Sequence, residues 1–178
     1  MSFLALRDTL PDYANDLKSS VDRLNAETVL SDQQKWGCYL TCAFALGVPE
    51  VIQAATFDAE TRLSIAARKS AKAAAAISGM NAVYFSAVNA LRNTEYRIAS
   101  PHFSQAALTH EGVEKIDVEL WSLAASALAN SAPSLNAHEA ELHKRGVSIE
   151  MIQAAIRIAA IVSAISIVVR GEVATIGV

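Results

Sequence analysis

Residues 113–146 read VEKIDVELWSLAASALANSAPSLNAHEAELHKRG, and this stretch decides the fold. Its first part, up to Asn130, is rich in leucine and alanine and lacks glycine and proline, which is typical of a buried helix. Pro133 disfavours a helical conformation at Ala132 and suits the first turn of a new helix. Gly146 is a suitable residue to end that helix. The stretch therefore predicts two helices joined by a tight turn.

The rest of the chain follows the same pattern. Apolar residues make up 52% of the 178 residues, aromatic residues only 6%, and alanine is abundant. No segment shows the alternation of a half-buried strand. We therefore expect an all-α fold with closely packed small residues. The chain is long enough for a sizeable core, so residues 1–178 are expected to form one domain.

Caps and breaks predict where the other helices lie. The N-terminal region is helical to about Leu24 and is interrupted at Pro11, while Ser31 and Gln34 have the spacing of a capping box. Further helices are expected at 31–46, 49–58, 63–85, 103–112 and 148–169, with 92–102 as the longest loop.

The order of these elements suggests an internal duplication with approximate halves 1–92 and 93–178. Trp36 and Trp121 stand at matching places, each two positions after a polar residue. Each tryptophan helix is followed by a break, a short helix and a long alanine-rich helix. The sequence thus predicts a single helical domain built from two similar halves.

Charge and hydropathy limit the possible partners and locations. The net charge of −3 and the pI of about 5.8 do not favour nucleic-acid binding. The apolar run from Ile158 to Val169 is shorter than the roughly 20 residues of a membrane span, so we expect a buried helix, partly covered by another subunit. The charged start lacks a secretory signal, and with only Cys38 and Cys42 there is no disulfide framework. A cytoplasmic location is expected.

The predicted turn carries the candidate chemistry. Ser131 and Ser134 lie at a helix start, where free N–H groups and the helix dipole would activate a thiol but give little to a serine. His138 is one turn after Ser134, and Glu119 on the preceding helix could orient that histidine or act as a base. His102, His110 and His143 show no clustered spacing and are expected to be surface residues. Simpler interpretations are capping serines, a partly exposed histidine and a solvated glutamate.

Several segments resemble the alkyl hydroperoxide reductase D (AhpD) family, within the wider carboxymuconolactone decarboxylase-like superfamily. They include LRDTLPDYANDLK, LSDQQKWG, AARKSAKAAAAISGMNAVYF, ELWSLAASA and AIRIAAIVSAI. The family's motif is a glutamate followed by Cys-x-x-Cys-x-x-x-His. Glu119 and His138 match the glutamate and the histidine, and both cysteine positions are serine here, Ser131 and Ser134.

The resemblance implies an all-α homotrimer that acts as a thiol peroxidase and disulfide reductase. A thiolate at position 134 would attack the peroxide, and a thiol at position 131, nearer the surface, would resolve the sulfenic acid. The implied partners are an alkyl hydroperoxide reductase peroxiredoxin and a lipoylated dihydrolipoamide acyltransferase, whose lipoyl group supplies the electrons. No metal and no tightly bound cofactor are implied.

The two serines leave this chain without the redox sulfurs, because Ser-x-x-Ser cannot form a disulfide. An engineered double Cys-to-Ser variant explains the retained Glu119 and His138 better than natural loss does. A natural non-catalytic scaffold or regulator, or a non-thiol acid–base enzyme of the superfamily, remains an alternative. A serine hydrolase lacks support, because no G-x-S-x-G motif is present. Cys38 and Cys42 share one helix face and are expected to be small buried residues.

Overall fold

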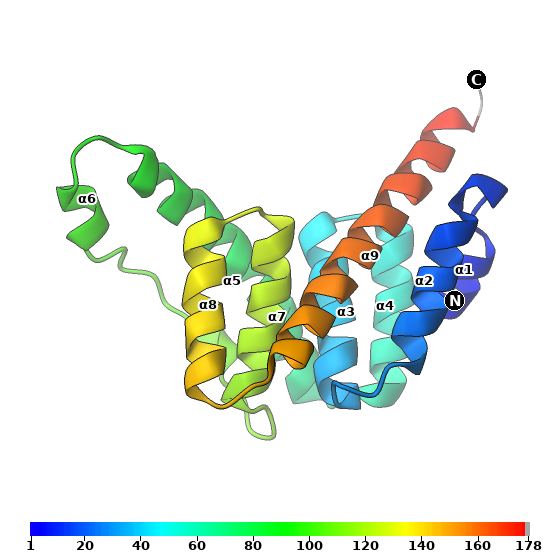
Figure 1. Ribbon diagram of the computed structural model, residues 1–178, viewed down its shortest axis with the longest axis horizontal. Helices are drawn as coiled ribbons and strands as arrows, with labels where there is room; N and C mark the ends of the chain where they lie inside the picture. Colours follow the sequence, from blue (N-terminus) through cyan, green and yellow to red (C-terminus); the bar gives the residue numbers. More distant parts are fainter. Residues whose placement is uncertain (177–178) are drawn as a thin grey trace.

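Two buried helices, α3 (Asp32–Leu46) and α7 (Lys115–Leu128), lie side by side at the centre of the computed structural model, which describes residues 1–176. The long helices α5 (Ile65–Ala90) and α9 (Ile149–Thr175) each contact both central helices. Helix α4 (Pro49–Arg62) covers α3, and α8 (Ala132–Lys144) covers α7 (Figure 1). The described residues contain no strand, which confirms the all-α class.

The element order α3–α4–α5 recurs as α7–α8–α9. The helices contain 15, 14 and 26 residues in the first set and 14, 13 and 27 in the second. Each long helix also crosses to the central helix of the other set. This recurrence matches the order that the sequence suggests. The division between residues 92 and 93 stays a prediction, and residues 177–178 lie outside the described part.

The N-terminal segment is attached to this body by buried apolar side chains and by polar contacts. It consists of α1 (Phe3–Asp8), a 3-10 turn (Asp12–Ala14) and α2 (Asn15–Ala26), which pack on α4 and α9. The backbone N–H of Phe3 donates to the buried carboxylate of Asp58 at 2.6 Å. The buried ammonium of Lys35 donates to the carbonyls of Asn25 and Glu27, so it satisfies acceptors at the end of α2.

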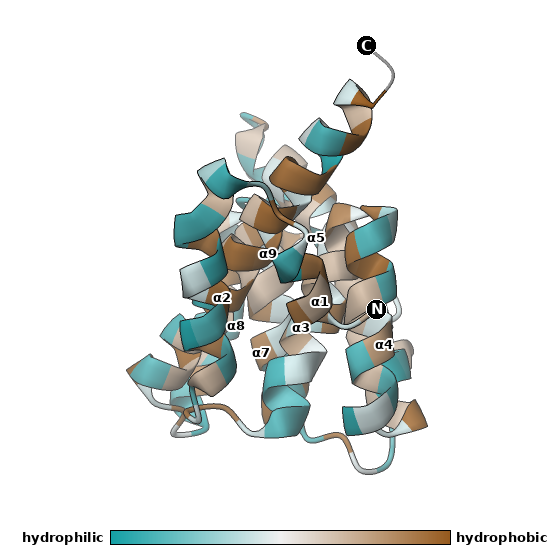
Figure 2. Cartoon of the chain, turned by 90° about the vertical axis from the view of Figure 1, so that its right-hand side faces the viewer, coloured by the Kyte–Doolittle hydropathy of each residue, from teal (hydrophilic) through white to brown (hydrophobic). Residues whose placement is uncertain are grey.

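The central contact depends on a glycine opposite a tryptophan. Trp121 of α7 is fully buried, and its indole N–H donates to the Gln34 carbonyl of α3 at 3.1 Å. A Cβ on Gly37 would lie only 2.1 Å from Cε2 of Trp121, so α3 can approach α7 this closely only with glycine there. Apolar residues line the inward faces of the helices, and hydrophilic ones gather at their outer ends (Figure 2).

One segment departs from the sequence prediction. Helix α5 runs to Ala90 rather than to residue 85, and it projects from the body together with the short helix α6 (Glu95–Ile98), which lies inside the expected loop (Figure 1). The helix expected at 103–112 is wrong, because only a 3-10 turn (Ala106–Leu108) forms there. Leu108 is the one buried residue of that stretch, and short helices are marginal in water without packing.

Helix α9 is the one described helix long and apolar enough, by length and composition, to cross a membrane, with a mean hydropathy of 2.2 over its most apolar window. Half of that window is buried in the protein, and the helix packs on α2, α3, α4 and α7. Such burial is typical of a core helix, as the sequence predicts. The exposed side of α9 carries Ile156, Ile167 and Val173, and its coverage by another subunit stays a prediction.

Candidate functional site

The turn between α7 and α8 has a defined hydrogen-bond pattern. Asn130 adopts the left-handed conformation with φ of 50°, and its N–H donates to the Ala127 carbonyl at 3.1 Å. The N–H of Ser131 donates to the Ser126 carbonyl, also at 3.1 Å. These two bonds form a Schellman motif, which satisfies carbonyls at the end of α7. The motif fixes Ser131 as the N-cap residue of α8.

The two serines of the turn face each other. Ser131 occupies the N-cap position, but its side chain makes no capping bond to the helix. Its hydroxyl instead donates to the Ser134 hydroxyl at 3.1 Å. The plain capping interpretation is therefore wrong for the side chain of Ser131. Both residues are buried, Ser131 completely and Ser134 with 6% of its surface exposed, so position 131 is the deeper one and not the one nearer the surface.

Glu119 and His138 form a pair beside these serines. The turn brings α7 and α8 side by side, and Nδ1 of His138 lies 2.6 Å from Oε2 of Glu119. The Glu119 side chain is only 8% exposed, which contradicts a solvated surface charge. An ionised carboxylate can only accept, so the proton of the bond lies on Nδ1. This tautomer leaves Nε2 of a neutral His138 as a proton acceptor.

Lys115 is a third member of this group. Its ammonium lies 2.7 Å from Oε1 of Glu119, so His138 and Lys115 bind different oxygens of one carboxylate. Burial alone would raise the pKa of Glu119, but the hydrogen bonds and charges of His138 and Lys115 outweigh it and lower that pKa. Lys115 was not predicted from the sequence to be part of the site. Its spacing of one helical turn from Glu119 is the signal that could have identified it.

A cavity of about 250 Å³ adjoins the serines. Ser134 and His138 line it from α8, together with Pro133 and Ala137 of the same helix. The other wall is formed by Asn81 and Phe85 of α5 and by Gln105, which the sequence analysis did not assign to the site. Ser131 lies behind Ser134 and is not part of the lining, so position 134 is the one that a ligand in this cavity meets first.

The helix start gives this corner a positive electrostatic character. Pro133 has no N–H, but the backbone N–H groups of Ala132 and Ser134 lie in the first turn of α8, where no intrahelical acceptor is available. Together with the helix dipole they favour negative charge at this end. A thiolate at 131 or 134 would be stabilised there, whereas a serine hydroxyl stays protonated at neutral pH.

The cysteines that the chain does contain cannot replace this chemistry. Cys38 and Cys42 are free and fully buried in α3. Burial raises the pKa of both thiols, and the neighbouring Cys42 and Asp117 add to the effect at Cys38. A buried neutral thiol is unreactive. Within residues 1–176 no three histidine, cysteine or carboxylate side chains gather as a metal site would require.

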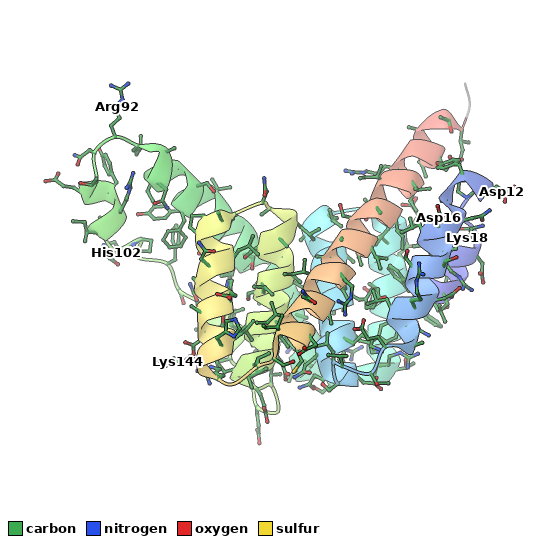
Figure 3. All side chains as sticks on the ribbon, in the orientation of Figure 1. Asp12, Asp16, Lys18, Arg92, His102 and Lys144 are labelled. Carbon is green, nitrogen blue, oxygen red and sulfur yellow. The ribbon has the colours of Figure 1, made fainter. Side chains whose placement is uncertain are left out.

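None of the other histidines, His102, His110 and His143, lines the cavity. His102 is exposed on the projecting segment that follows α6 (Figure 3). His143 is exposed and pairs with Glu139 at 2.8 Å on the outer face of α8. A larger groove between α2 and α9 contains Arg23, Glu27 and Arg157 but none of the site residues. The four residues singled out from the sequence are therefore the ones that the structure brings together.

Comparison with known proteins agrees with this description. Residues 95–170 match the carboxymuconolactone decarboxylase family. The chain is 46% identical to the alkyl hydroperoxide reductase AhpD of Hyphomonas neptunium, over 98% of this chain and 97% of that protein. It is also 46% identical to the protein of the same name from Maricaulis maris, over 97% and 99% of the two chains. The Frankia alni protein of that name is 41% identical, over 95% and 91%.

Proposed function

Because this chain belongs to the alkyl hydroperoxide reductase AhpD family, we propose that it has the active-site framework of a peroxide-reducing thiol enzyme, with serine at both redox positions. The observation that carries the proposal is the group of Ser131, Ser134, His138 and Glu119. Two side chains 3.1 Å apart lie at a helix start beside a histidine–glutamate pair. A Cys-x-x-Cys pair placed there would have every group that thiol oxidation needs.

The chemistry of the cysteine form follows from the positions of the side chains. A thiol at 134 gives its proton to Nε2 of His138, and the resulting thiolate attacks the terminal oxygen of a peroxide in the cavity. The O–O bond breaks, the sulfur becomes a sulfenic acid, and the alkoxide leaves with a proton from His138, which Glu119 orients. The thiol at 131 then attacks the sulfenic sulfur, which releases water and forms the disulfide. One peroxide is thus reduced to an alcohol by two thiols.

The burial of position 131 determines which sulfur of the disulfide the electron donor attacks. Only the sulfur at 134 would face the cavity, so an incoming dithiol would attack that sulfur and release the thiolate at 131. The two serine oxygens are 3.1 Å apart. Because C–S bonds are longer than C–O bonds, small side-chain rotations would bring two sulfurs to the S–S distance of about 2.0 Å.

The partners of the cysteine form are part of the same proposal. The electron donor is the lipoyl group of a dihydrolipoamide acyltransferase, and the electron acceptor is an organic peroxide or a partner peroxiredoxin. The protein works as a homotrimer in the cytoplasm, without a metal or a tightly bound cofactor. The partners, the trimer and the lack of a bound cofactor are what the resemblance to the AhpD family implies, and the location is the one expected from the sequence.

The chain with two serines is inactive in this chemistry. It should not reduce cumene hydroperoxide with dihydrolipoamide, because Cys38 and Cys42 are buried and neutral. An engineered double replacement accounts for the intact pair of Glu119 and His138. A non-catalytic scaffold with natural serines is the second candidate, and an acid–base enzyme that uses only this pair is a third.

The experiment is to restore the sulfurs. Ser131→Cys with Ser134→Cys should reduce cumene hydroperoxide with dihydrolipoamide as donor, whereas each single replacement should be oxidised but should not turn over. The chain with both serines is the negative control. A folded double variant without lipoyl-dependent turnover would contradict the proposal. Serine codons at both positions of the native gene would favour the scaffold, and cysteine codons the engineered variant.

A further inference from the structure

Asn81 has a buried acceptor that no group of the protein uses. It lies on α5 and lines the cavity beside Ser134 and His138. Its side-chain oxygen Oδ1 is buried and has no hydrogen-bond partner among the described residues. Most buried polar atoms in proteins are hydrogen-bonded, so such an acceptor needs an explanation. Asn89, two turns further along α5, has an ordinary local role, because its amide donates to the Phe85 carbonyl at 2.7 Å.

We propose that Asn81 recognises the substrate by accepting a hydrogen bond from the terminal O–H group of a small organic hydroperoxide. The hydrocarbon part of that substrate lies against the apolar part of the lining, formed by Phe85, Pro133 and Ala137. The inference deepens the proposed function and rests on it, since it assigns a specificity residue to the same cavity.

The chemistry of the cavity favours this class of ligand. Apart from His138, its lining contains no basic side chain, so a carboxylate or phosphate would lose its hydration without gaining a strong ion pair. The nearby cation, Lys115, is already paired with Glu119. At about 250 Å³ the cavity lies below the roughly 300–1,000 Å³ of sites for drug-sized ligands. A small, neutral molecule with one hydroxyl donor fits these limits.

The proposed hydrogen bond is compatible with the reaction. When the sulfur at position 134 attacks the terminal oxygen, that oxygen keeps its proton and becomes the hydroxyl of the sulfenic acid. Asn81 can therefore accept from the same O–H before and after the O–O bond breaks. The contact would hold the terminal oxygen in place throughout the step, which is how a fixed orientation assists a reaction. A dialkyl peroxide or an ether has no such donor and would not be held.

The serine form allows this idea to be tested without turnover, because it cannot consume a peroxide. The two ligands are tert-butyl hydroperoxide and tert-butyl methyl ether, which have similar shapes and differ in a terminal O–H or methyl group. The unchanged chain should bind the hydroperoxide about tenfold more tightly than the ether in an NMR titration, as expected for one neutral hydrogen bond. Asn81→Leu should remove this preference, with affinity for the ether nearly unchanged.

Two further variants control the result. Asn89→Leu makes the same replacement on the same helix outside the cavity, and it should keep the preference for the hydroperoxide. Asn81→Asp retains an acceptor and should also keep it. Thermal unfolding of each variant shows that the fold is intact. The inference is overturned if Asn81→Leu keeps the preference, or if the unchanged chain does not distinguish the two ligands.

Failure of this inference can be separated from failure of the proposed function. Turnover by the Ser131→Cys, Ser134→Cys protein that is indifferent to Asn81→Leu leaves the enzyme assignment intact and removes the role of Asn81. A preference that depends on Asn81 in the serine form, without turnover in the cysteine form, keeps the recognition site and removes the peroxidase assignment.

Discussion

The turn from α3 to α4 and the turn from α7 to α8 are built alike but contain different side chains. Each has a left-handed residue, Gly47 with φ of 72° or Asn130 with φ of 50°. An extended N-cap residue follows, Val48 or Ser131, and a proline stands in the first turn of the next helix. The two turns thus reverse the chain with the same sequence of backbone conformations, at matching places in the two halves.

The side chains at the two corners differ in polarity. Counted from the N-cap, the residues that correspond to the four site residues are Trp36, Val48, Val51 and Ala55. Trp36 therefore corresponds to Glu119 in this register, and not to Trp121 as the sequence suggested. All four are buried and apolar, so in the first half this corner belongs to the core. In the second half the same places hold two hydroxyls, a carboxylate and an imidazole. The corner itself is therefore a requirement of the fold, and the polar group is an addition that folding does not need.

The largest effect is expected for the acid–base pair. In the protein with Ser131→Cys and Ser134→Cys, Glu119→Gln or His138→Gln should lower kcat/KM for peroxide by roughly 10²–10⁴-fold, because the alkoxide then lacks its proton donor. His143→Gln on the outer face of α8 is the matched control and should change little. A loss below about threefold for both site variants would make them structural residues.

The contact that joins the two halves should give the next largest effect. Gly37→Ala would place a methyl group inside the indole of Trp121, so we expect a loss of about 3 kcal/mol in the free energy of unfolding, the upper end for overpacking. Gly79→Ala is the matched control, because no atom lies within 4 Å of its added Cβ. That variant should gain about 0.5–1 kcal/mol from helix propensity. Equal effects in urea unfolding would refute the close packing at Gly37.

The two left-handed residues allow the corners to be compared directly. Gly47→Ala should cost about 1–2 kcal/mol of stability, because alanine is strained at positive φ and its Cβ meets no other atom there. Asn130→Ala should cost less, about 1 kcal/mol, since asparagine is itself only tolerated at positive φ. Asn130→Gly should be neutral or slightly stabilising. Denaturant unfolding measures all three, and a stable Gly47→Ala would mean that the first corner is not left-handed.

The smallest effect concerns Lys115, which is half exposed. Lys115→Met removes one of the groups that lower the pKa of Glu119, so that pKa should rise. In the cysteine form the acid limb of the pH–rate profile should move to higher pH, with a change of only about threefold at pH 7. Lys115→Arg should keep the original profile. An unshifted acid limb in Lys115→Met would exclude a role for this ion pair.

The same shift has a consequence for stability. A lowered pKa means that ionised Glu119 stabilises the fold above its ordinary value of 4.5, and that this contribution disappears as the pH falls through the lowered pKa. The difference in unfolding free energy between the unchanged chain and Lys115→Met should therefore be largest near neutral pH and should shrink in acid. A difference in unfolding free energy that increased as the pH fell would contradict the lowered pKa of Glu119.

Local signals predicted much of the fold and the candidate site. Ser31 and Gln34 form the expected capping box, Ser148 caps α9, and α8 begins within one residue of the expected Pro133. These features depend on a few neighbouring residues, so they can be predicted from the local sequence. The pairing of Glu119 with His138 also followed, because a tight turn forces adjacent helices to lie side by side.

Features that depend on contacts between distant segments were not predictable in this way. Nothing in the sequence places Gly37 against Trp121, because their contact is set by how closely α3 approaches α7. The burial of Ser131 follows from the packing around the turn and not from its residue type. Asn81 became part of the site only because α5 packs beside α8.

The central claim is that only the second corner activates sulfur, and one measurement tests it most directly. Ser131→Cys with Ser134→Cys is compared with Val48→Cys and Val51→Cys in the other corner, and the pH dependence of iodoacetamide labelling and peroxide-induced disulfide formation is followed by mass spectrometry. The account predicts rapid labelling below pH 8 and one intramolecular disulfide for the 131/134 pair, with neither for the buried 48/51 pair. It is contradicted if the cysteines at 131 and 134 titrate near the ordinary ~8.5 and form no disulfide, or if both corners react alike.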